Sequence, residues 1–111
     1  MTAERRVFAG LGAAPGRATG PAHLLRAQAD ALDVPAGSIL VARVVNPYLA
    51  PLFLRVAGVV VEEGGLLQHA TRLAREFGIP AVVGVARATE LFSDGEILEV
   101  SGDSGEVVRT G

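Results

Sequence analysis

Three short, continuous runs of apolar residues constrain the fold of this chain more than any other feature of its sequence. They are Ser38–Ala42, Gly58–Val61 and Ala81–Val83, and their length and composition are typical of strands that are buried on both faces. The two segments between them carry helical patterns. Strand, helix, strand, helix and strand joined by short connections predict two right-handed crossovers and a parallel, three-stranded core.

The first predicted helix spans residues 48–57. Asn46 is expected to cap it and Pro47 to take its first position, which suits a residue without a backbone N–H. Gly58 is expected to end it. Its apolar residues recur at helical spacing and are Leu49, Leu52, Phe53 and Val56.

The second predicted helix follows the glycine pair Gly64-Gly65 and ends at Gly78–Pro80. Its apolar face consists of Ala70, Leu73, Ala74 and Phe77. Its polar face consists of His69, Arg72 and Glu76. We expect the turn before the helix to need a positive φ or a close backbone approach at Gly65, so that Gly65→Val would damage the site or the fold.

The flanking segments are expected to form a second, antiparallel layer. The strands predicted there are Val7–Gly10, Gly20–Leu25, Glu96–Val100 and Glu106–Arg109. Residues 11–16 are predicted as a glycine-rich connection, because their spacing fits neither a dinucleotide-binding nor a Walker loop. Residues 26–35 are predicted as a helical turn or loop, residues 88–92 as one helical turn, and residues 102–105 as a hairpin.

Composition limits the class of protein. Because 50% of the 111 residues are hydrophobic and only 20% are charged, we expect one globular domain spanning residues 1–111. A formal net charge of -2 gives no electrostatic reason to expect binding to nucleic acid or to a membrane. The lack of cysteine excludes disulfides and thiol catalysis. No signal peptide and no membrane-spanning apolar run is recognisable, so a cytoplasmic protein is expected.

His69 has the position best suited to chemistry. It lies on the polar face in the first turn of the second predicted helix, directly after a glycine turn. Free N–H groups and the positive end of the helix dipole favour an anion such as phosphate at that place. A neutral imidazole there could receive a phosphoryl group while its oxygens are held. On spacing alone, a solvated histidine near a helix start is the favoured interpretation.

Other site chemistries find less support. A metal site would need several ligands at defined spacing, and the only histidines are His23 and His69, so no metal is expected. No serine has the Gly-x-Ser-x-Gly surround of a nucleophile elbow. Glu62 and Glu63 are neighbours at a strand end and should point to opposite faces, so they make a poor acid–base pair.

The central run combines Gly64-Gly65, His69, Ala74-Arg75-Glu76 and the uninterrupted segment Gly78–Gly84. This run resembles the phosphohistidine, or swivelling, domain of the phosphoenolpyruvate-utilising enzymes, a family that includes phosphoenolpyruvate synthase, pyruvate phosphate dikinase and rifampicin phosphotransferase. Further matches extend the resemblance over nearly the whole chain; they are Ala14–Gly16, Gly20–Ala22, Gly37–Val41 and Asp94-Gly95. The resemblance implies an α/β swivelling fold of three layers, β/β/α, with a parallel central sheet and a second antiparallel layer.

The resemblance also assigns roles within the site. It implies that His69 is phosphorylated and that Gly64-Gly65 support the phosphate. Glu62 matches an acidic position of the family, and either orients His69 or is a solvated strand end. Gln68 stands where the family usually has serine, although its amide can still donate a hydrogen bond. Arg72 replaces an aliphatic residue, and either pairs with the phosphate or is an exposed helix arginine.

The function that the resemblance implies is that of a phosphoryl carrier between a nucleotide-binding partner and a second acceptor site. The expected partners are an ATP-grasp domain and a phosphoryl-acceptor domain, in the same larger protein or as separate chains. ATP and Mg are expected on those partners and no cofactor on this domain. The chain would then be part of a phosphotransferase and turn over nothing alone. The alternative is a non-catalytic interaction or regulatory module that kept the fold but lost phosphorylation, which Gln68 favours.

Overall fold

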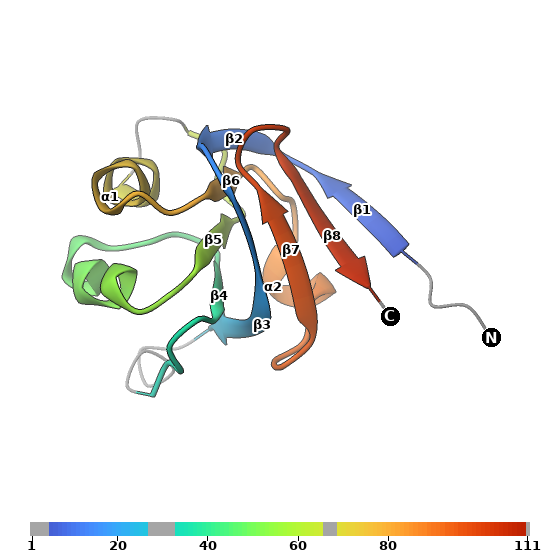
Figure 1. Cartoon of the computed structure of the whole chain (residues 1–111), viewed down its shortest axis with the longest axis horizontal. Helices are drawn as coiled ribbons and strands as arrows, with labels where there is room; N and C mark the ends of the chain where they lie inside the picture. The colour runs from blue at the N-terminus through green and yellow to red at the C-terminus, as the bar shows by residue number, and fades with distance from the viewer. Residues whose placement is uncertain (1–4, 27–32, 66–68, 111) are drawn as a thin grey trace.

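The computed structural model describes residues 5–26, 33–65 and 69–110 (Figure 1). The strands in these ranges are β1 (Arg5–Ala9), β2 (Leu11–Ala14), β3 (Arg17–Leu25), β4 (Ile39–Ala42), β5 (Gly58–Val61), β6 (Ala81–Val83), β7 (Ile97–Ser101) and β8 (Glu106–Thr110). The helices are the 3-10 helix η2 (Pro47–Leu54) and the α-helices α1 (His69–Phe77) and α2 (Ala88–Leu91). None of them is long and apolar enough to cross a membrane.

The strands follow the order β1-β8-β7-β3-β4-β5-β6-β2. β3, β4, β5 and β6 are mutually parallel, as predicted for the last three of them, and β3 adds a fourth strand. β3 belongs to both layers: residues 17–21 pair antiparallel with β7, whereas residues 22–25 pair in parallel with β4. β7, β8 and β1 continue as the predicted antiparallel layer.

The parallel sheet lies between two apolar cores, because its alternate side chains point to opposite faces. One core lies under α1 and η2 and includes Leu40, Ala42, Val59, Val61, Ala81 and Val83. The other lies against the antiparallel layer and includes Ile39, Val41, Val60, Val82, Leu98 and Val100. In Figure 1, α1 and η2 lie on one side of β4 and β5, and β7 and β8 lie on the other. The α/β fold with three layers, β/β/α, is therefore confirmed.

The first predicted helix is shorter and tighter than expected. It is a 3-10 helix from Pro47 to Leu54 and not an α-helix over residues 48–57, and the side chain of Asn46 makes no capping hydrogen bond. Pro51 lies inside it and explains the difference, since a proline ring clashes with the carbonyl four residues earlier in an α-helix. Leu49 and Phe53 still face the core, as the spacing predicts.

The predicted connection over residues 11–16 was wrong for Leu11–Ala14, which form the edge strand β2. β2 pairs antiparallel with β6, and its register shifts between Gly12 and Ala14. A Cβ at Gly12 would lie 2.0 Å from the carbonyl oxygen of Gly102, so only glycine fits this strand. The glycine that indicated a loop is required by a neighbouring backbone, which the local sequence does not reveal.

The remaining predicted elements are present where the structure describes them. α2 is the single helical turn expected after β6, and β7 and β8 are joined by a turn over residues 102–105. Within this turn the amide of Gly105 donates to the carbonyl of Ser101 over 2.9 Å. Most of the segment predicted as a helical turn or loop, residues 27–32, lies outside the described residues.

Candidate functional site

The candidate site lies where the parallel strands end. Residues 62–65 leave β5 at its carboxyl end, and α1 then returns along the sheet on the side that η2 also covers. Ligands of parallel α/β sheets bind at this edge, because the turns between strands and helices gather there. His69 is the first residue of α1 and is exposed. The fold therefore presents an imidazole at the edge of the sheet where ligands usually bind.

The two faces of α1 follow the predicted pattern. His69, Arg72 and Glu76 are exposed, and Ala70 and Ala74 are fully buried. Leu73 and Phe77 are less covered than the pattern suggests, although the ring of Phe77 lies 6.4 Å from that of Phe53. Among the described residues, neither His69 nor Arg72 has a hydrogen bond or ion pair. Both side chains are thus open to a ligand.

Thr71 is the unexpected residue of this helix. It is fully buried, and its Oγ1 has no hydrogen-bond partner among the described residues. A buried hydroxyl without a partner costs about 1 to 3 kcal/mol relative to one that is bonded. Position 71 lies two residues after His69, on the opposite side of the helix, so the Thr71 hydroxyl faces the core and not the imidazole.

The glycines around the turn do not behave as expected. Gly65 lies outside the left-handed region, and a Cβ there would meet none of the described atoms within 4 Å. The expectation that Gly65 needs a positive φ or a close approach was therefore wrong. The close approach is at Gly64, because a Cβ on Gly84 would lie 3.4 Å from the Gly64 Cα. Gly84 also has the positive φ of 73°.

Glu62 has a partner that the sequence did not suggest. Its Oε2 accepts hydrogen bonds from the backbone N of Thr89, at 2.9 Å, and from Thr89 Oγ1, at 2.5 Å. Glu63 is exposed. In the described part of the chain, the contacts of Glu62 lead to α2. No local pattern could have identified Thr89, which is 27 residues away.

The predicted site residues thus fall into three groups. His69 and Arg72 are exposed on the first turns of α1, Gly64 and Gly65 follow the end of β5, and Glu62 bonds to Thr89 on α2. Gln68 lies outside the described residues. Within the described ranges, no group of three or more His, Asp or Glu side chains is arranged to hold a metal ion.

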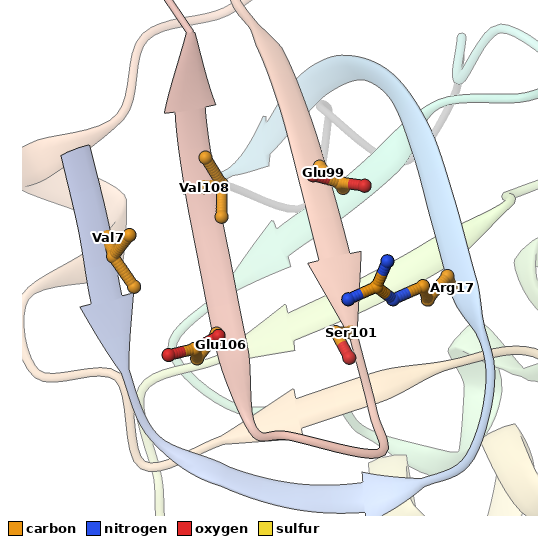
Figure 2. Close-up of a pocket in the computed structure, with 6 residues that line it drawn as sticks. All are labelled: Val7, Arg17, Glu99, Ser101, Glu106 and Val108. Atoms are coloured by element: carbon orange, nitrogen blue, oxygen red, sulfur yellow. The ribbon is translucent and has the colours of Figure 1, made fainter. Parts of the chain in front are cut away.

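A shallow hollow of about 470 Å³ lies elsewhere, on the outer face of the antiparallel layer. Figure 2 shows the side chains that line it; they are Val7, Arg17, Glu99, Ser101, Glu106 and Val108. They come from β1, β3, β7 and β8, so the parallel sheet and both cores separate the hollow from α1. It plays no part in a site built on His69.

Comparisons with known proteins show which family the chain is similar to. Residues 34–105 match the family model described as the PEP-utilising enzyme mobile domain. The chain is 46% identical to a rifampicin phosphotransferase from Streptomyces sp over 90% of its own length and 11% of the relative's. It is 40% identical to a probable phosphoenolpyruvate synthase from Archaeoglobus fulgidus over 88% of its length and 13% of the relative's.

A solved structure shows the same relationship. The solution structure of an Enzyme I protein aligns with 73% of this chain and 33% of its own, with 28% identity and a TM-score of 0.61. The chain spans only 11% and 13% of the two curated relatives, and its match covers a third of the Enzyme I structure. The matched region therefore accounts for one part of each of those proteins.

Proposed function

Because the chain belongs to the family of PEP-utilising enzyme mobile domains, we propose that it carries phosphoryl groups on His69 as part of a phosphotransferase. The observation that carries the proposal is the place of His69, exposed at the first position of α1 beside the carboxyl ends of β4 to β6. A donor can reach this side chain from solvent.

The chemistry requires one nucleophile and a cradle for the phosphate. A ring nitrogen of His69 attacks the phosphorus in line, an N–P bond forms, and the P–O bond to the donor's leaving group breaks with its electron pair. An acceptor oxygen then attacks the phosphorus and the N–P bond breaks, which returns the imidazole. N–H groups of the first turn, the Gly64-Gly65 backbone and the Arg72 guanidinium would hold the phosphoryl oxygens.

The size of the relatives supports the proposal that the chain works with partner domains. The chain spans only 11% and 13% of the two curated relatives, which leaves room in such proteins for domains that bind donor and acceptor. We propose an ATP-grasp domain that supplies ATP and Mg, and a second domain that binds the acceptor. They belong to the same larger protein or to separate chains, and without them the chain turns over nothing.

A non-catalytic module of the same fold is the alternative. Gln68 favours it, because the family usually places serine directly before the histidine. The two functions differ in one property, since only the carrier forms phosphohistidine at position 69.

Labelling distinguishes the two functions. The chain is incubated with cell extract and labelled phosphoenolpyruvate or ATP, and the label is then exposed to acid and to base. The carrier gains a label that acid removes and base spares. The label is lost in His69→Ala and kept in His23→Gln, the matched variant at the only other histidine. Label that survives acid, or that remains on His69→Ala, would contradict the carrier function.

A further inference from the structure

We propose that Thr89 is a positioning residue for the phosphohistidine site, and that it acts through the carboxylate of Glu62. This inference rests on the proposed function of His69 and concerns a residue that neither the sequence patterns nor the site itself pointed to. Thr89 lies on α2 (Ala88–Leu91), in a different part of the fold from α1.

The first step is the strength of the link. Glu62 Oε2 accepts from both the backbone N and the Oγ1 of Thr89, at 2.9 and 2.5 Å. Such O–H···O⁻ contacts are short and roughly twice as strong as bonds between neutral groups. Both residues are half-buried, so water screens the contact less than it would at the surface.

The second step is that this link closes a ring of contacts around the turn that leads to α1. From Thr89 the chain runs back five residues to Gly84, whose N donates to the carbonyl of Glu63 over 3.0 Å. A Cβ added at Gly84 would lie 3.4 Å from the Gly64 Cα, so the two backbones run close together. Glu63 and Gly64 follow Glu62 directly. The Thr89 hydroxyl thus helps to hold the turn from which α1 and its histidine begin.

The third step is that α2 is itself a fixed support. Arg26, at the end of β3, donates from Nε and Nη2 to the Thr89 carbonyl, at 3.3 and 3.0 Å. Ala88 is fully buried between the two sheets. Arg87, just before α2, has a φ of 61°, a costly conformation that persists only where the surroundings determine it. The Glu62 carboxylate is therefore hydrogen-bonded to an element that is itself fixed against the core.

The consequence concerns rate more than stability. Loss of the Thr89 hydroxyl leaves the Glu62 carboxylate with only the hydrogen bond from the Thr89 backbone N. The turn that follows Glu62 then becomes more mobile, and the His69 imidazole spends less time in the orientation that attacks the phosphorus. Binding of a donor by partner domains would not change.

The experiment compares three variants of the full chain. Thr89→Val removes the hydroxyl at nearly constant volume, Thr89→Ser restores it, and Glu90→Gln is the matched control. Glu90 is the next residue of α2, and the bond that its carboxylate forms is with exposed Arg87. Phosphorylation of His69 by phosphoramidate, a small phosphoryl donor that needs no partner domain, is followed by nuclear magnetic resonance. The His69 ring signals and the exchange rate of the Gly84 amide are recorded on the same samples.

We expect Thr89→Val to slow phosphorylation about three- to tenfold, to shift the His69 ring signals and to speed exchange of the Gly84 amide. Thr89→Ser should recover most of the rate, and Glu90→Gln should match the original chain. In a Glu62→Ala background the effect of Thr89→Val should vanish, because a residue that acts through Glu62 has nothing left to act on. Should Thr89→Val fail to fold, Glu62→Gln replaces it, and we expect it too to slow phosphorylation, shift the His69 ring signals and speed exchange of the Gly84 amide.

An undiminished effect in the Glu62→Ala background, or no recovery by serine, overturns the positioning role. Failure of the proposed function looks different, since the original chain would then take no phosphoryl group at His69 from phosphoramidate or from cell extract. In that case the test depends on the His69 ring signals and the exchange rate of the Gly84 amide. If Thr89→Val changes neither of them, the inference is overturned.

Discussion

At the residue scale, the chemistry depends on which side chains α1 turns toward solvent. His69 and Arg72 are three residues apart and exposed, so they lie on neighbouring positions of one helical face. An imidazole and a guanidinium in this relation suit a phosphoryl group that is bound to one and paired with the other. Glu62, which matches an acidic position of the family, bonds to Thr89.

Arg72 and His69 should therefore differ in how much their loss costs. We expect His69→Ala to abolish phosphorylation, and Arg72→Ala to slow it by an amount equivalent to about 1 to 3 kcal/mol, typical of one charge-assisted hydrogen bond. Both variants should keep the thermal midpoint of the original chain, since both side chains are exposed. Single-turnover rates test this, with Glu76→Ala as the control on the same face. Unfolding of His69→Ala would instead mark His69 as a structural residue.

The glycines of the turn give a second prediction at this scale. Gly84 has a φ of 73° and lies against Gly64, so Gly84→Ala should destabilise the fold by about 1 to 2 kcal/mol. In Gly65→Ala the added Cβ would lie within 4 Å of no described atom, so this substitution should change the free energy of unfolding little. Urea denaturation of the two variants measures the difference. Equal losses would show that Gly65 is constrained after all.

At the element scale, the edge strand β2 is stabilised by a contact with α1. β2 is short, lies at the edge of the sheet and changes register between Gly12 and Ala14. Arg75, on α1, donates from Nε to the carbonyl of Ala13 over 2.7 Å. The helix that carries the candidate nucleophile therefore also satisfies a carbonyl where the ladder is irregular.

Arg75 should accordingly be a stability residue and not a site residue. Arg75→Gln should lower the free energy of unfolding by about 1 to 2 kcal/mol, because it weakens a part-buried bond from a charged donor. Amide exchange should accelerate in β2 more than in β5. Arg72→Gln, one turn earlier on the exposed face, is the matched control and should leave both quantities unchanged. The reverse ranking would contradict the support that we assign to Arg75.

At the scale of the whole molecule, the parallel sheet divides the interior into two cores. Val59 and Val60 are both fully buried, yet the first belongs to the core under the helices and the second to the core between the sheets. Val60 is also the register partner of Val82 on β6, in the same core. Adjacent residues in the chain are thus separate in packing, and distant ones are joined.

Double-mutant cycles can test this division. Each of Val59→Ala, Val60→Ala and Val82→Ala should cost about 1 to 3 kcal/mol through lost burial and the cavity that remains. The costs of Val59→Ala and Val60→Ala should add closely, since their side chains share no core. Those of Val60→Ala and Val82→Ala should depart from additivity, because the two cavities adjoin. Denaturant titration supplies the free energies, and strong coupling between positions 59 and 60 would contradict the division.

The sequence by itself determined the layered α/β plan and the exposed face of α1. Both depend on apolar periodicity over a few consecutive residues, which reports directly which side chains avoid water. The apolar runs that form β4, β5 and β6 have no polar face, so they fit only strands of a sheet that is covered on both sides. His69 could be placed on the polar face because the residues that define the apolar face lie within two turns of it.

Only the tertiary structure decided the features whose partners are distant in the chain. The carbonyl of Gly102 lies too close to Gly12 for any side chain at that position of β2, and Thr89 binds Glu62 across 27 residues. Each contact joins two segments that meet only after folding, and no local sequence pattern in either segment predicts the other as its partner. Hydrogen bonds and close backbone contacts act over only a few ångströms. They therefore cannot be predicted until the fold shows which distant segments lie side by side.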